Sequence, residues 1–358
     1  MSPTPEISTF WREFAAAEAA LYALPLGEQV ERANALLAEH IDGLALEVMG
    51  AEGDAVLDLI ATAHGSVELF PQLTQLAAAA PALAHFRVSA FRTRSDEPDF
   101  PMGMDGFELA SSEVLVALQP DNGQIALELR FTREMAPEFV EHAQQMSFIM
   151  LDHVLGEYDF AVKVGAVDFV DGDDEEQTWT PLHRLPAVFD AYWADEMGHT
   201  GLFPAGSHAW TALDLEFDCA VDDEGNDVDE DDLPDGEDAN AGEGTVTVNT
   251  SANAVAMRAD LVWALTLAAD VPDEAAGAAL HDLQVQAATL LQGPQLGIGA
   301  WTLVGEGRYQ ALFYVTDEAL ARGALAPLLA RAGLPAVEVK VSFDPAWAGY
   351  FEYASYLA

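Results

Sequence analysis

The spacing of apolar residues over 259–343 restricts the fold more than any other feature of this chain. Apolar side chains alternate with smaller or polar ones at 261–267, which predicts a strand with one buried face. The alternation of apolar residues then ends, and a helix follows. Pro272 begins a helix that Gly293 is expected to end, because glycine tolerates the left-handed conformation common at helix ends. The chain therefore leaves a half-buried strand and enters a helix that can pack on it.

Two short strands, a second helix and a final strand are predicted in the rest of this stretch. The strands lie at 298–304 and 309–315 on either side of a glycine turn, and the second helix is expected to stop at Gly333. Apolar residues then alternate again over 337–343. The order of strand, helix, strand, strand, helix, strand is the split β-α-β order of a ferredoxin-like unit, with helices on one face of an antiparallel sheet.

The N-terminal half is predicted to repeat this order, so the expected fold class is α+β with two ferredoxin-like units in tandem. Here the Asn122-Gly123 pair marks a hairpin, a long helix spans 134–155, and a strand at 160–170 closes the unit. The chain of 358 residues has room for two such domains. The predicted organisation is N-terminal helices at 1–42, a first unit at 43–171, a linker with a short helix at 172–206, and a second unit with a C-terminal helix at 207–358.

Acidic residues outnumber basic ones by a wide margin, with 61 Asp and Glu against 14 Lys and Arg and a net charge of -47. Such a surface would repel nucleic acids and anionic membranes, so neither is expected as a partner. A basic protein surface is the expected partner. The alternative is that the charge serves solubility in a salt-adapted cell, without a specific binding role. The scarcity of lysine, present only as Lys163 and Lys340, fits that alternative.

An acidic insertion at 222–243 interrupts the second unit and is the predicted partner-binding segment. It holds twelve acids and no base, and such a composition cannot bury apolar surface. Its glycines, Gly225 and Gly236, do not match the ligand spacing of a calcium EF-hand loop. The residues predicted to contact a basic partner are Asp222, Asp223, Glu224, Asp227, Asp229, Glu230, Asp231 and Asp232.

Three residues of the long helix offer an alternative function as a metal-dependent hydrolase. Glu138, His142 and His153 project to nearly one side of that helix, and histidine with carboxylate on one helix face suits zinc or iron. Asp152 and Glu157 lie near its end. The sequence has no H-E-x-x-H pair, no G-x-S-x-G elbow and no phosphate-binding loop. No catalytic residue and no cofactor are therefore assigned, and a non-enzymatic binding or regulatory role is preferred.

The single cysteine, Cys219, rules out an intramolecular disulfide and argues against an oxidised extracellular scaffold. The first residues lack the basic segment and apolar core of a signal peptide. No run reaches the ~18 apolar residues that a membrane helix needs. A cytoplasmic location is therefore expected.

The C-terminal part of the chain resembles the bacterial domain-of-unknown-function family 695. The residues that carry this resemblance are Gly307, Arg308, Phe313, Tyr314, Val315, Asp317, the run 337–341, Asp344, Pro345, Trp347 and Tyr350. That family is similar to the regulator of ribonuclease activity B, so the resemblance implies an acidic, ferredoxin-like nuclease inhibitor. Residues 64–71 and 151–159 resemble bacterial proteins with no assigned reaction. The acidic insertion departs from the family pattern.

Overall fold

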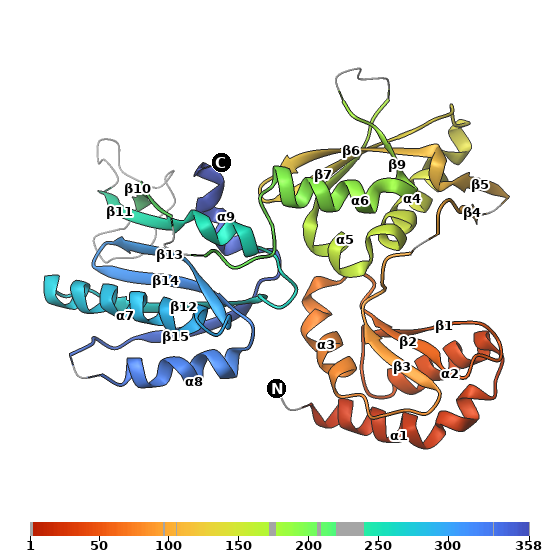
Figure 1. Ribbon diagram of the computed structural model, residues 1–358, viewed down its shortest axis with the longest axis horizontal. Coiled ribbons are helices and arrows are strands. Elements are labelled where there is room, and N and C mark those ends of the chain that lie inside the picture. The colour runs from red at the N-terminus through yellow and green to blue at the C-terminus, as the bar shows by residue number, and fades with distance from the viewer. Residues whose placement is uncertain are drawn as a thin grey trace, which may run out of the picture. The chain divides into compact units, whose positions relative to one another are not determined.

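The computed structural model describes residues 3–95, 97–104, 106–171, 177–205, 209–219, 240–331 and 333–357. The chain divides into two compact units, Met1–Glu196 and Met197–Ala358, and the boundary lies inside the predicted linker. Both units combine helices with sheets that are wholly or partly antiparallel, which confirms an α+β fold (Figure 1). Among the described residues, no helix has the length and apolar character needed to cross a membrane.

The first part of unit 1 is a three-stranded sheet with helices packed against it. Its elements are α1 (Pro5–Tyr22), α2 (Leu26–Ala38), β1 (Ala45–Met49), β2 (Leu57–Thr62), α3 (Phe70–Ala78) and β3 (Phe86–Ala90), in the sheet order β1-β2-β3. The Thr4 side chain caps α1 by accepting a hydrogen bond from the Ile7 N–H. Ile7, Phe10 and Phe14, which recur at helical spacing, are fully buried. Two helices thus occupy the N-terminal segment, as the sequence predicts.

The second part of unit 1 is a four-stranded sheet with its own helices. Its elements are β6 (Val114–Asp121), β7 (Gln124–Phe131), α4 (Val140–Leu155), α5 (Glu157–Lys163), β8 (Val164–Phe169), β9 (Thr180–Pro181) and α6 (Leu185–Ala191), in the sheet order β8-β7-β6-β9. A short hairpin of β4 (Pro101–Met104) and β5 (Phe107–Ala110) precedes it. The predicted hairpin joins β6 to β7, and Asn122 and Gly123 have the positive φ values, 45° and 86°, that such a tight turn requires.

The single antiparallel sheet predicted for 43–171 is not formed. β2 and β3 are direct, parallel neighbours joined through α3. In a ferredoxin-like unit a third strand would separate these two, so their direct pairing leaves no place for the β6-β7 hairpin. The hairpin pairs instead with β8 and β9 in a second sheet, where β7 and β8 are again parallel. Two larger sheets and the two-stranded β4-β5 sheet therefore replace the predicted one.

The strand predicted at 160–170 is also wrong in its first part, because the chain is helical up to Lys163. Gly156 causes this difference. Its φ of 78° lets the chain turn sharply between α4 and α5, and an added Cβ would lie 3.0 Å from the Arg92 carbonyl oxygen. A new helix therefore begins directly after α4, and β8 starts only once that helix has ended.

Unit 2 is built on one six-stranded sheet. Its elements are β10 (Trp210–Cys219), β11 (Asn240–Asn249), β12 (Trp263–Asp270), α7 (Glu274–Gln292), β13 (Gly297–Gly305), β14 (Arg308–Val315), α8 (Glu318–Leu329) and β15 (Glu338–Phe343), in the antiparallel sheet order β10-β11-β13-β14-β12-β15. The element order predicted for 259–343 is present as β12-α7-β13-β14-α8-β15. Asp273 and Asp317 cap the two helices by accepting hydrogen bonds from the N–H groups of Ala276 and Leu320, each at 2.8 Å.

The two faces of this sheet carry different helices. α7 and α8 pack on one face, over a core that includes Leu283 and Phe313. The C-terminal helix α9 (Ala348–Ala354) lies on the other face, where the Trp301 indole N–H donates a hydrogen bond to the Gly349 carbonyl at 2.6 Å. The predicted C-terminal helix is thus present and packs on the sheet.

Asp344 and Trp347 fix the start of α9. The Asp344 carboxylate accepts hydrogen bonds from the Gly349 N–H at 3.0 Å and from the Tyr314 hydroxyl at 2.6 Å. The fully buried Trp347 ring stacks on the Tyr314 ring with centroids 3.9 Å apart, and its indole N–H donates to the Leu261 carbonyl at 2.7 Å. Burial raises the pKa of Tyr314 far above its ordinary value, so its hydroxyl remains a donor to Asp344.

Candidate functional site

The eight acids predicted to bind a partner, between 222 and 232, lie outside the described residues. The strands on either side are described. β10 ends at Cys219 and β11 begins at Asn240, and these two residues are paired neighbours. The acidic insertion therefore connects adjacent ends of two antiparallel strands. Glu243, its last residue, is exposed on β11.

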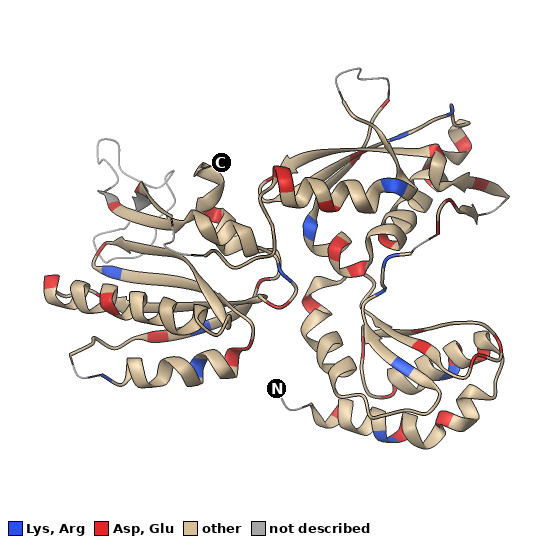
Figure 2. Cartoon of the chain, in the orientation of Figure 1, with Lys and Arg blue, Asp and Glu red and all other residues tan. Residues whose placement is uncertain are grey.

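Most basic side chains in the described part of the chain are held in ion pairs with carboxylates. The N–O distances run from 2.6 Å, as between Arg92 and Asp152, to 4.0 Å, as between Arg308 and Asp270. The paired basic residues are Arg12, Arg87, Arg92, Arg94, Arg133, Lys163, Arg258, Arg308, Arg322 and Lys340. Figure 2 shows the positions of Asp and Glu spread along the backbone of both units, with those of Lys and Arg scattered among them. The excess of acids is therefore uncompensated in each unit.

Three acids of unit 2 lie together near the end of the sheet where the acidic insertion attaches. Asp214 of β10, Glu243 of β11 and Glu306 of the β13-β14 turn line a hollow of about 620 Å³. The Thr245 hydroxyl donates a hydrogen bond to Asp214 at 3.2 Å. Because two neighbouring strands and the β13-β14 turn supply these carboxylates, this end of the sheet carries a local negative surface. We call these three residues the acidic end of the sheet.

The helix face predicted to hold a metal does not bring its residues together. Glu138 lies in a 3₁₀ turn, Pro137–Phe139, so α4 begins after the predicted start at 134 and does not include it. His153 packs edge-on against the Phe100 ring, with centroids 4.9 Å apart. Among the described residues, the potential ligand atoms of Glu138, His142 and His153 do not form a group within 4.8 Å. These three side chains therefore cannot share one metal ion in this arrangement.

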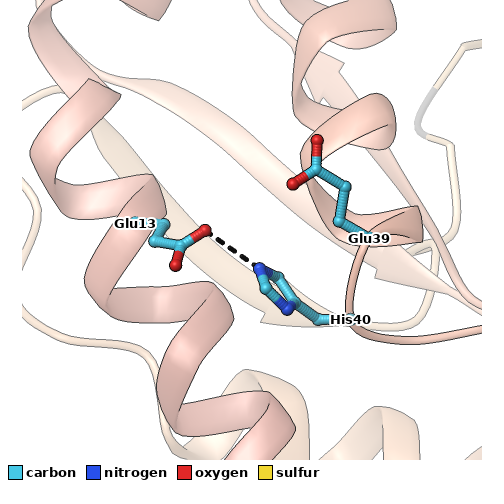
Figure 3. Close-up of side chains that lie close together, drawn as sticks. All are labelled: Glu13, Glu39 and His40. Atoms are coloured by element: carbon cyan, nitrogen blue, oxygen red, sulfur yellow. Dashed lines mark hydrogen bonds and ion pairs between the residues drawn. The ribbon is translucent and has the colours of Figure 1, made fainter.

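Glu13, Glu39 and His40 form a group whose potential ligand atoms do lie within 4.8 Å of one another (Figure 3). Glu13 comes from α1, and Glu39 and His40 directly follow α2. Two carboxylates and an imidazole suit a divalent ion such as zinc. The His40 Nε2 atom already lies 3.0 Å from a Glu13 carboxylate oxygen, so an ion would have to displace that hydrogen bond. The hydrogen-bonded pair accounts for the geometry without a metal.

Replacing Glu13 with glutamine is expected to lower the melting temperature slightly at neutral pH and to have no effect at strongly acidic pH. The hydrogen bond from His40 lowers the pKa of the Glu13 carboxyl from its ordinary value of 4.5. A lowered pKa in the folded state stabilises the fold above the unfolded value, and this stabilisation is lost as the pH falls through the folded value. Thermal unfolding from neutral to acidic pH checks this, with Glu39→Gln as the matched control. A difference that persisted at the acidic end would contradict it.

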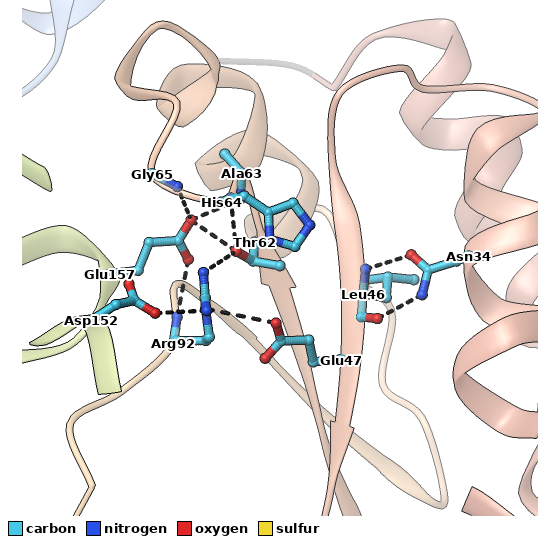
Figure 4. Close-up of polar contacts among 10 residues, drawn as sticks. All are labelled: Asn34, Leu46, Glu47, Thr62, Ala63, His64, Gly65, Arg92, Asp152 and Glu157. Carbon is cyan, nitrogen blue, oxygen red and sulfur yellow. Dashed lines mark hydrogen bonds and ion pairs between the residues drawn. The ribbon is translucent and has the colours of Figure 1, made fainter. Parts of the chain in front are cut away.

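Glu157 is a fully buried carboxylate that joins the two sheets of unit 1 (Figure 4). Its Oε1 atom accepts hydrogen bonds from the Thr62 hydroxyl at 2.8 Å and from the N–H groups of Ala63 and Gly65 at 2.9 and 3.1 Å. Its Oε2 atom accepts from the Arg92 N–H at 3.2 Å. These donors lie at the carboxyl ends of β2 and β3, which meet at one edge of the sheet because the strands are parallel.

The Arg92 side chain adds a second set of charges at this edge. One guanidinium nitrogen lies 2.6 Å from the Asp152 carboxylate of α4, and another lies 3.7 Å from Glu47 of β1. A third contact, from the guanidinium to the Thr62 hydroxyl oxygen, measures 3.5 Å. Burial raises the pKa of Asp152, while the nearby guanidinium acts in the opposite direction. The edge is therefore held by a connected set of charged and polar groups.

Four donors occupy the Glu157 carboxylate, so it is not free to act as a general base. The arrangement is a structural anchor in which one charged group satisfies the N–H groups of two loops. Sequence reasoning placed Asp152 and Glu157 near a helix end but gave them no role, because Thr62 and Arg92 are 95 and 65 residues from Glu157 along the chain. The Gly156-Glu157 pair after a long helix is the one local signal of this anchor.

Asn34 of α2 covers the edge strand β1 (Figure 4). Its side-chain oxygen accepts a hydrogen bond from the Leu46 N–H at 2.8 Å, and its side-chain nitrogen donates to the Leu46 carbonyl at 2.7 Å. The amide thus makes the pair of hydrogen bonds that a neighbouring strand would make.

Comparison of the chain with protein-family models, with curated proteins and with solved structures finds no match. The resemblance of 307–350 to family 695 therefore stays a prediction, and so does the nuclease partner that it implies.

Proposed function

We propose that the protein is a non-enzymatic binding or regulatory protein whose acidic surface docks on a basic protein partner. The observation that carries this proposal is the pairing of most described basic side chains with carboxylates, which leaves the acid excess uncompensated. A surface potential of one sign speeds association with a partner of the opposite sign and repels nucleic acids. The resemblance of residues 307–350 supports a nuclease as that partner.

We also infer that residues 263–343 form a ferredoxin-like unit. The strand order β13-β14-β12-β15, with every pair antiparallel, supports this inference, because the first strand of the unit lies between the third and the fourth. β11 and β10 extend the sheet beyond β13. The acidic insertion thus belongs to the two added strands and not to the unit itself.

Affinity purification with the full chain as bait tests the proposed function. Retained proteins are identified by mass spectrometry at low and at moderate salt, and the leading basic candidate is then purified and its dissociation constant measured against salt concentration. We expect a specific basic protein whose association rate falls as salt rises, because the attraction is screened beyond a Debye length of ~8–10 Å. Failure to retain any basic protein at low salt would contradict the proposal and leave solubility as the role of the charge.

Neutralising the predicted contact acids is expected to slow association with that purified partner by at least about tenfold. The variant changes the eight acids between 222 and 232 to Asn or Gln. A matched control changes eight exposed acids of unit 1 to Asn or Gln and so has the same net charge. The control residues are Glu28, Glu31, Asp42, Glu52, Glu97, Glu134, Glu138 and Glu141.

Stopped-flow measurement of the association rate separates the two variants. The insertion variant should associate more slowly than the control if the predicted residues form the contact surface. Equal rates would show that only total charge matters and would contradict the assignment of the contact to the acidic insertion.

A further inference from the structure

The α7 face of the sheet in unit 2 is covered over only part of its width by the described helices. α7 packs on β13 and β14, and α8 packs over the side of the sheet that includes β12 and β15. β10 and β11 lie beyond α7, and on this face Trp210 of β10 is 37% exposed. Neighbouring strands are spaced by ~4.8 Å, so two strands make a strip ~10 Å wide. That width matches the diameter of one α-helix, ~10 Å.

The strip and the outer side of α7 together form a groove of about 970 Å³. We call it the α7 groove. Its floor includes Thr247 of β11 and Val304 of β13, and its wall includes Val285 of α7. Val285 and Val304, which both line this hollow, are 47% and 48% exposed, and such exposure is unusual for valine. The groove is thus a partly apolar channel that runs beside a long helix.

One polar group of the α7 groove has no hydrogen-bond partner among the described residues. The Tyr309 hydroxyl is completely buried, in a residue that is 4% exposed. Gln284, which is 5% exposed, adds a side-chain amide to the lining of the same groove. Buried polar groups are normally paired, so an unpaired hydroxyl in the lining of a groove points to a bound group that pairs with it.

The α7 groove opens toward the acidic end of the sheet. Val271 and Val304 line both the groove and the hollow of Asp214, Glu243 and Glu306, so the two are continuous. A ligand that fills both must therefore present apolar groups along the channel and positive charge at its end. A helix with one apolar face and basic residues meets both conditions.

We propose that the α7 groove binds one amphipathic, basic helix of the protein partner. The apolar side of that helix lies against Val285 and Val304, and its basic residues lie over Asp214, Glu243 and Glu306. The Tyr309 hydroxyl pairs with a polar group of the bound helix. This inference rests on the proposed function, because it identifies the part of the basic partner that enters the protein.

A synthetic helix tests the inference on the full chain. The probe is a peptide of about 14 residues, ~21 Å as a helix, with leucines on one face and lysines on the other. The comparison peptide has the same composition in a scrambled order and therefore the same charge without an apolar face. Dissociation constants are measured by fluorescence anisotropy at physiological salt. Hydrogen exchange then locates the peptide, with protection expected in α7 and in β11 and β13 at the groove.

A first pair of substitutions tests whether the apolar residues of the groove, and not general charge alone, contribute to binding. Val285→Gln with Val304→Gln is expected to weaken binding of the amphipathic peptide at least about tenfold, because the apolar contact is lost. The matched control, Leu320→Gln with Val56→Gln, changes two exposed apolar residues elsewhere, at 58% and 51% exposure, and should change the dissociation constant less than about twofold.

A second pair of variants tests the acidic end. Asp214→Asn with Glu306→Gln should weaken binding more than Glu28→Gln with Glu31→Gln, which removes the same charge from α2.

The outcomes distinguish this inference from the proposed function. Tighter binding of the amphipathic peptide, with the groove footprint and the expected order of variants, supports the inference. Equal binding of both peptides, without an effect of the groove variants, overturns the inference but leaves an acidic docking surface. Absence of binding by either peptide, even at low salt, overturns both.

Discussion

Replacing Glu157 with alanine is expected to lower the free energy of unfolding of unit 1 by roughly 3–5 kcal/mol. The side chain is fully buried and accepts hydrogen bonds from Thr62, Ala63, Gly65 and Arg92. Alanine would leave these buried donors without an acceptor, and each unsatisfied donor costs about 1–3 kcal/mol. It would also separate the loops after β2 and β3 from the start of α5. Few single substitutions in this unit should have a larger effect.

Urea unfolding followed by hydrogen exchange of unit 1 peptides measures this effect without interference from unit 2. Glu157→Gln should fall between the wild type and alanine, because it keeps one oxygen acceptor but turns an amide donor toward another N–H group. Glu141→Ala, on the exposed side of α4, is the control and should change stability by less than about 0.5 kcal/mol. A Glu157→Ala protein as stable as this control would show that the anchor contributes nothing.

Replacing Trp347 with alanine is expected to destabilise unit 2 by about 3–5 kcal/mol. The ring is fully buried, stacks on Tyr314 at 3.9 Å, and donates a hydrogen bond to the Leu261 carbonyl. Its removal would leave a large cavity between α9 and the sheet and an unpaired carbonyl. The Trp347 backbone is left-handed, with a φ of 56°, and this conformation is unfavourable for a residue other than glycine. Alanine keeps that strain and loses the contacts that stabilise it.

Thermal unfolding with near-UV circular dichroism measures the loss in unit 2. Trp347→Phe should recover much of the packing but not the indole hydrogen bond, and Trp347→Gly should relieve the backbone strain while keeping the cavity. Trp210→Ala is the control, because that ring is 37% exposed. If Trp347→Ala were no more destabilising than Trp210→Ala, the C-terminal helix would not be an integral part of the core.

The sequence predicts unit 2 better than unit 1, and the reason is the range of the interactions. The alternation over 261–267 and 337–343, together with the capping residues Asp273 and Asp317, are local signals, and the elements that they predict are present. The order of strands in a sheet depends on pairing between distant segments. In unit 1 the direct parallel pairing of β2 with β3 cannot be read from local periodicity, so the sequence predicts one sheet where two larger sheets and the β4-β5 pair are formed.

The features of the candidate site also differ in whether the sequence can predict them. Composition alone reveals the acid excess, and ion pairing in the structure leaves that excess uncompensated. The Glu157 anchor joins residues 65 to 95 positions apart, and no spacing rule connects them. The α7 groove could not be predicted either. The groove exists because β10 and β11 extend the sheet past α7, which covers β13. Which strands a helix covers depends on tertiary packing and cannot be read from the local sequence.

The amide of Asn34 has a consequence for the protein at high concentration. Unpaired strand edges allow one copy of a chain to recruit the next, and such addition can continue into fibrous aggregates. Because the Leu46 peptide groups on the β1 edge are already bound within the same molecule, a second copy gains nothing by approaching there. One side chain thus occupies the position at which a strand of a second copy would pair with Leu46.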